Sequence, residues 1–144
     1  MKNKGCAYGK VDDIKTMDDA ITAISILAIS SDGKISKKEV DMIENMLRVS
    51  PIYENIRPIK LYIDCVYNLV MKNTRDEVIK KSVKLIPERL RPTVFGWIYM
   101  IVKSDKKLTQ SEHRFMDEVF KELKINGNLA GKIKAVCEIL LRSE

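Results

Sequence analysis

The sequence has little of what β-rich, disulfide-rich or zinc-binding proteins need. Six glycines and four prolines in 144 residues are too few for the many turns of a β-sandwich. The three cysteines, Cys6, Cys65 and Cys137, are far apart in the sequence, and with the single histidine, His113, they cannot form an ordinary structural zinc site. We therefore expect free thiols, buried or in a tail, in a reducing compartment.

The sequence also lacks the patterns of membrane insertion and export. The longest apolar run, residues 94–102, is about half the length that a transmembrane helix needs. Lys2 and Lys4 are not followed by an apolar stretch, so no signal peptide is expected. Together these features predict a cytoplasmic protein.

The overall composition is that of an ordinary globular domain. Hydrophobic residues make up 45% and charged residues 32%, which excludes a disordered or fibrous chain. The formal net charge of +6 is not concentrated in the way a dedicated nucleic-acid binder requires. The length predicts one compact domain over residues 16–144, preceded by a flexible tail at residues 1–15, in a monomer or weak homodimer.

Helical periodicity dominates the chain, and no segment alternates apolar and polar residues as a strand does. Ala20, Ile24 and Leu27 share one helix face, and Leu129, Ile133, Val136, Cys137 and Leu140 repeat this spacing. Gly96, Trp97 and Tyr99 are interpreted as core packing. The pattern predicts an all-α fold of about seven helices over residues 17–30, 37–48, 58–72, 75–86, 88–103, 110–124 and 128–142.

Capping signals mark the ends of several predicted helices. A hydroxyl residue followed three positions later by a carboxylate can satisfy two free backbone N–H groups. Pro58 and Pro87 suit first helical turns, and Pro92 predicts a kink or restart within residues 88–103. Asn126 and Gly127 predict a left-handed stop after Leu123. The four capping boxes are predicted at Thr16–Asp19, Ser36–Glu39, Thr74–Glu77 and Thr109–Glu112.

One segment of the sequence is repeated. Residues 31–39 (SDGKISKKE) align with residues 104–112 (SDKKLTQSE), 73 positions later. Each copy follows an apolar helix and leads into an amphipathic one. The repeat therefore predicts two similar hairpins, each a helix, an acidic turn and a capped helix, packed in one domain about a pseudo-twofold axis.

An ordinary EF-hand does not fit the repeated turn. With Gly33 at the sixth loop position, the first and third positions fall on Ala28 and Ser30, where carboxylates belong. In the second copy they fall on Ile101 and Lys103. The first ligands are thus missing in both copies.

Each copy consists of an apolar helix, the motif Ser-Asp-x-x-Ile/Leu-Ser/Thr-x-x-Glu and an amphipathic helix. Over roughly residues 17–142, this duplicated pattern resembles the tellurite-resistance TerB-like family. The resemblance implies an all-helical, internally duplicated domain of bacterial stress and tellurite resistance, with no established enzymatic activity. It also implies a cytoplasmic adaptor that binds a partner protein, and membrane proteins of stress-resistance systems are among the partners it implies. Carried over by position, the metal ligands suggested for the family are Asp32, Glu39, Asp105 and Glu112.

Those four acidic residues have two interpretations. If the duplication brings the turns together, their carboxylates would hold a hard cation such as Ca²⁺, Mg²⁺ or Mn²⁺, completed by waters. Alternatively, Glu39 and Glu112 complete capping boxes, while Asp32 and Asp105 bridge tight turns. The structural interpretation is favoured because it explains each residue singly. Lys106 replaces the glycine of the second turn, which makes that turn the weaker metal candidate.

Basic residues at 75–91 form a second candidate surface. Lys80, Lys81 and Lys84 share one side of a predicted helix, and Arg89 and Arg91 follow. A solvated helix face is the favoured interpretation. The functional alternative is a charge-driven interaction module that contacts acidic protein, anionic lipid or RNA. Nucleic acid is the least favoured of these because no aromatic residue alternates with the basic ones.

Catalysis finds no support in the sequence. It has no Gly-rich phosphate loop, and its one histidine has no evident partner for a nucleophilic triad. A hidden metal-dependent hydrolase is a minor hypothesis. The sequence thus predicts a non-enzymatic adaptor.

Overall fold

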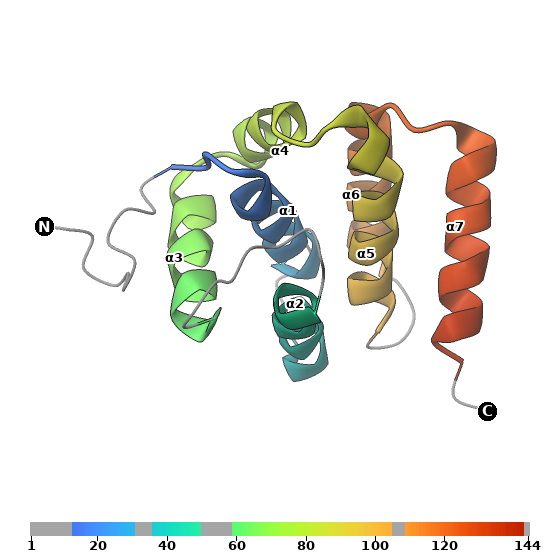
Figure 1. The fold of residues 1–144 in the computed structure, drawn as a ribbon, viewed down its shortest axis with the longest axis horizontal. Helices are drawn as coiled ribbons and strands as arrows, with labels where there is room; N and C mark the ends of the chain where they lie inside the picture. The colour runs from blue at the N-terminus through green and yellow to red at the C-terminus, as the bar shows by residue number, and fades with distance from the viewer. Residues whose placement is uncertain (1–12, 31–35, 50–58, 105–108, 143–144) are drawn as a thin grey trace, which may run out of the picture.

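A computed structural model describes residues 13–30, 36–49, 59–104 and 109–142 of the chain. The described residues form an all-α fold with no strand, which confirms the predicted fold class (Figure 1). None of these helices has the length and hydrophobicity that a bilayer crossing requires. The elements are α1 (Met17–Ser30), α2 (Lys37–Val49), α3 (Ile59–Lys72), α4 (Arg75–Lys84), the short 3₁₀ helix η1 (Glu88–Leu90), α5 (Arg91–Lys103), α6 (Gln110–Leu123) and α7 (Gly127–Leu140).

Helix α1 lies at the centre of the fold because it is apolar on nearly every side. Every residue from Asp19 to Ile29 is buried, as expected for a helix without a solvent-facing stripe. It packs against α3, α4 and α5, with further contacts to α2 and α6. Helices α2 and α6 bury one stripe each and expose a polar face. This arrangement places the core around α1 and α5.

All four predicted capping boxes are present. Ser36 Oγ accepts the backbone N–H of Glu39 at 3.1 Å, and Glu39 Oε1 accepts the N–H of Ser36 at 3.0 Å. The same reciprocal pair forms between Thr16 and Asp19, Thr74 and Glu77, and Thr109 and Glu112. Four helix starts could therefore be predicted from the sequence to the residue.

Several predicted helix ends differ from the structure by one or two residues, and two further differences have a clear physical reason. The single helix predicted at residues 88–103 is a 3₁₀ turn followed by α5, with Pro92 in its first turn, so the predicted restart is confirmed. The predicted left-handed stop after Leu123 is present, but its assignment to Asn126 and Gly127 is wrong: Lys124 takes the left-handed conformation, at φ 55°. The Asn126 side chain instead accepts the first free N–H groups of α7, because asparagine suits an N-cap as well as a left-handed stop. Pro58 and the first twelve residues of the predicted tail lie outside the described residues.

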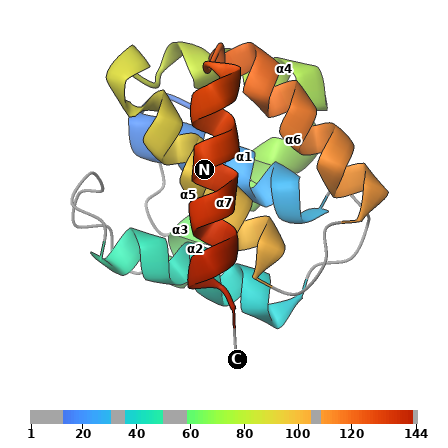
Figure 2. The ribbon, with the colours of Figure 1, turned by 90° about the vertical axis from the view of Figure 1, so that its right-hand side faces the viewer.

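Helix α7 stands at one end of the molecule. Figures 1 and 2 both place it beside α5, as the outermost helix on that side. Its one extensive packing partner among the described helices is α5. The two helices are joined by a hydrogen bond from the Tyr99 hydroxyl to Glu138 Oε2 at 2.6 Å and by the Lys134 ammonium over the Tyr99 ring. The position of α7 leaves much of its surface open.

Candidate functional site

The predicted metal ligands are only partly within the described residues. Glu39 and Glu112 are buried, with 3% and 4% of their surface exposed, and each carboxylate accepts the N–H of its own cap residue. Asp32 and Asp105 lie outside the described residues. Across the described segments, no group of three or more His, Cys, Asp or Glu side chains is placed to hold a metal ion. Cation binding by the four acidic residues thus stays a prediction.

The predicted basic surface takes part in the packing of the domain. Arg75 and Lys80 of α4 pair with Glu118 and Glu122 of α6 at 2.9 Å and 3.4 Å. Lys80 also lies 3.6 Å from Asp76 on its own helix. Exposed pairs of this kind contribute only about 0–1 kcal/mol each, but they orient α4 on α6.

Three other basic residues of this stretch, Lys84, Arg89 and Arg91, differ in their surroundings. Arg91 is half-buried and donates to the backbone carbonyls of Ile86 and Val83. Lys84 and Arg89 are exposed, and neither forms an ion pair within the described residues. Of the predicted basic face, these two side chains are the ones available to a partner.

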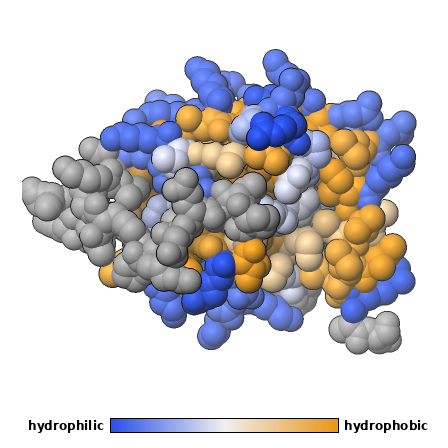
Figure 3. Space-filling model, viewed as in Figure 1, coloured by the Kyte–Doolittle hydropathy of each residue, from blue (hydrophilic) through white to orange (hydrophobic). Residues whose placement is uncertain are grey.

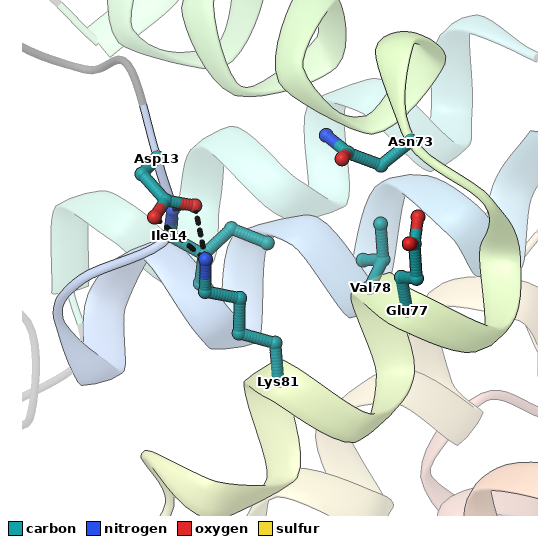
Figure 4. Close-up of a pocket in the computed structure, with 6 residues that line it drawn as sticks. All are labelled: Asp13, Ile14, Asn73, Glu77, Val78 and Lys81. Atoms are coloured by element: carbon teal, nitrogen blue, oxygen red, sulfur yellow. Dashed lines mark hydrogen bonds and ion pairs between the residues drawn. The ribbon is translucent and has the colours of Figure 1, made fainter.

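A small pocket lies between the start of α1 and α4 (Figure 4). Its volume of about 30 Å³ suits a water molecule and not a substrate. Lys81 Nζ donates to both carboxylate oxygens of Asp13, at 2.5 and 2.6 Å. This hydrogen bond, followed by the one from the Ile14 N–H, lowers the pKa of Asp13. The pocket is lined by Asp13, Ile14, Asn73, Glu77, Val78 and Lys81. We interpret it as a junction that holds the first described residues on α4.

A second, wider hollow lies between α5 and α7. It has a volume of about 370 Å³ and walls that are mostly apolar. We call it the α5–α7 groove. Its lining residues are Pro92, Thr93, Gly96, Trp97 and Met100 of α5, and Lys132, Ile133, Val136 and Cys137 of α7.

The groove is shallow because α7 approaches α5 closely at a glycine. A side-chain carbon added at Gly96 would lie 3.2 Å from Ile133 Cγ2, so only glycine fits without a shift. Cys137 is buried at this contact, and its thiol lies 3.6 Å from the Gly96 carbonyl. Burial, followed by the charge of Glu138, raises the pKa of Cys137. The thiol therefore stays protonated at neutral pH and acts as a packing group and not a nucleophile.

Beyond the groove, the surface of α7 remains apolar. Leu129, Val136, Ile139 and Leu140 are exposed, Val136 by 53%. Figure 3 shows hydrophobic side chains at the surface over the α5 and α7 end of the molecule. The sequence revealed the apolar stripe of this helix, but periodicity could not show that solvent, not core, faces most of it. The prediction that Trp97 packs in the core is likewise only partly met, because this half-buried side chain lines the groove.

The expectation of free thiols is wrong for Cys65. This buried residue of α3 is disulfide-bonded, whereas Cys137 is a free thiol. Cys6 lies outside the described residues. Sequence spacing misled here because a disulfide depends on the distance between two Cα atoms in the fold and not on their separation along the chain.

Comparisons with protein families, curated proteins and solved structures found no match to this chain.

Proposed function

We propose that this chain is a non-enzymatic adaptor domain of the TerB-like kind, and that it binds a partner protein through the α5–α7 groove and the exposed stripe of α7. The observation that carries the proposal is the exposure of Val136, Ile139 and Leu140 beside an apolar groove. Contiguous exposed apolar surface on a monomer is typical of protein-binding sites.

The chemistry of the groove also favours binding over turnover. Its lining combines aromatic and aliphatic side chains with one exposed ammonium, Lys132. Enriched Trp and Met and few charges are typical of the buried centre of a protein interface. The nearest nucleophile, Cys137, is protonated and packed against Gly96.

The resemblance in the repeated acidic turns supports the finer part of the proposal, a role in bacterial stress or tellurite resistance from the cytoplasm. The helices around both copies begin and end at corresponding residues within one position, α1 and α2 in the first copy and α5 and α6 in the second. This agreement is what a duplicated TerB-like domain requires.

Partner capture with matched variants tests the adaptor function. Three baits are used in extracts of the cells that make this protein: the intact chain, Val136→Asp and Val49→Asp. Each captured protein is then purified and titrated against the three baits. Val49 is the control, since it is 77% exposed on α2 and does not line the groove. We expect Val136→Asp to weaken binding at least about tenfold and Val49→Asp to leave it unchanged. Equal binding by all three baits, or none by any, would overturn the proposal.

A charge-driven module is the second candidate, favoured by the exposed Lys84 and Arg89. It requires retention on heparin or anionic liposomes that collapses at high salt. The variant Lys84→Glu with Arg89→Glu should then lose retention. If the groove variant loses its partner while this variant keeps it, the adaptor function stands.

A further inference from the structure

Corresponding faces of α1 and α5 are covered to different extents. At the repeat offset of 73 residues, Ala23, Ile24 and Leu27 of α1 correspond to Gly96, Trp97 and Met100 of α5. The three α1 side chains are buried. The three α5 residues are half-buried and line the groove. The groove thus lies on the face of α5 whose corresponding face on α1 is buried.

In the first half, two helices that follow α2 pack against α1. Both α3 and α4 pack against α1, and α4 buries Val78, Ile79 and Val83. After α6 the described residues contain one further helix, α7, and it packs beside α5. One covering helix is present where the first half has two.

We propose, on the basis of the adaptor function above, that the α5–α7 groove receives one amphipathic α-helix of the partner protein, with acidic residues beside its apolar face. The partner helix would cover α5 as a second helix covers α1. It would bring aliphatic side chains at helical spacing, as α4 does.

The apolar residues of α7 at and beside the groove have the spacing that helix pairing uses. The exposed Leu129, Val136 and Leu140 and the half-buried Ile133 together follow steps of four, three and four residues, which is the alternation of a helix-pairing seam. The stripe spans about three turns, or roughly 17 Å. An amphipathic helix docks in such grooves through anchors at i, i+3 or i+4, and i+7.

The charge of the groove selects the partner over the other occupants. Among the described residues, Lys132 is the one charged residue of the lining, and no carboxylate lines the groove. A second copy of α7 would bring a net positive charge, from Lys132 and Lys134 against Glu138, to a groove that already holds Lys132, so a helix with Asp or Glu flanks fits better.

A displayed library of helical peptides tests the proposal. The library is selected on the full chain and counter-selected on Val136→Asp. Binding is measured by the fluorescence emission of Trp97, which lines the groove and is the one tryptophan of the chain. We expect peptides with apolar residues at helical spacing and acidic flanks. Lys132→Glu should weaken these peptides about threefold and favour basic flanks, while the matched Lys72→Glu on α3 should do neither.

Four outcomes would overturn the proposal. These are selected peptides without helical spacing, peptides that bind Val136→Asp equally well, a dimer of the free chain that Val136→Asp dissociates, and binding to anionic vesicles with the same variant dependence. The first two outcomes can occur while a natural partner is still captured through the groove. Either of them would then overturn the helix proposal and leave the adaptor function intact.

Discussion

The Tyr62 hydroxyl donates a hydrogen bond to Asp19 Oδ1 at 2.5 Å, between two buried side chains from α3 and α1. The other carboxylate oxygen, Oδ2, accepts the backbone N–H groups of Lys15 and Thr16. Asp19 therefore caps α1 and anchors α3 with the same carboxylate. The pair joins a local signal, the capping box, to a tertiary contact 43 residues away.

Removing the hydroxyl should destabilise the fold. Tyr62→Phe leaves the buried Oδ1 of Asp19 without this donor, and we expect a loss of about 2 kcal/mol in the free energy of unfolding, measured in urea. Tyr67→Phe, on the exposed side of the same helix, should change it by less than about 0.5 kcal/mol. Equal effects of the two substitutions would show that the Tyr62–Asp19 bond contributes nothing specific.

The same tyrosine should make the protein sensitive to alkali. Burial first, and then the hydrogen bond and charge of Asp19, raise the pKa of Tyr62 well above its ordinary value. Unfolded tyrosines ionise near about pH 10, so above that pH the unfolded state releases a proton that the folded state retains. Stability from this group is fully present below about pH 10 and falls as the pH rises further. Urea unfolding between about pH 9 and 11 should therefore show a shallower decline for Tyr62→Phe than for the intact chain.

The caps and the cation hypothesis can be separated in one series. Ser36→Ala and Thr109→Ala should each cost about 1 kcal/mol through the lost cap. Because Glu39 and Glu112 are committed to these caps, we expect millimolar Ca²⁺, Mg²⁺ or Mn²⁺ to leave the melting temperature unchanged. A rise that Asp32→Asn or Glu39→Gln abolishes would instead establish the cation site, since glutamine still completes a capping box.

The glycine at the α5–α7 contact should control how closely α7 packs. In Gly96→Ala the new carbon meets Ile133 Cγ2 at 3.2 Å. Because α7 is held mainly by α5, we expect this outer helix to shift and Cys137 to react faster with a thiol reagent. Alanine also favours the helical conformation by up to about 1 kcal/mol relative to glycine. Because this gain offsets the cost of the close contact, the free energy of unfolding should change little. Adding Ile133→Ala to this variant removes the clashing carbon. The reaction rate of Cys137 in the double variant should then match its rate in the single variant Ile133→Ala.

The disulfide at Cys65 should be detectable by alkylation. Without reductant, Cys137 of the denatured chain should react and Cys65 should not, and after reduction both should react. Reduction should lower the free energy of unfolding by about 2–4 kcal/mol. A chain trapped in its cells with Cys65 reduced would fit the predicted cytoplasmic location, whereas an oxidised one would fit an oxidising compartment.

Local chemistry determined most of the fold. Helix faces depend on apolar spacing, and helix starts depend on a hydroxyl and a carboxylate three residues apart, so both could be predicted from the sequence. The left-handed residue of the stop after Leu123 could not be predicted, because Asn126 serves a left-handed turn and an N-cap equally well and the path of the chain selects between them.

Tertiary structure alone decided where these faces lead. Leu129, Val136 and Leu140 follow the same periodicity as the buried residues of α1, yet they remain exposed because α7 packs on one neighbour while α1 packs on several. The basic residues predicted as a binding face are partly ion-paired with α6, a contact between residues more than 40 positions apart. Periodicity determines which side of a helix is apolar, and only the packing of the other helices determines whether that side is covered.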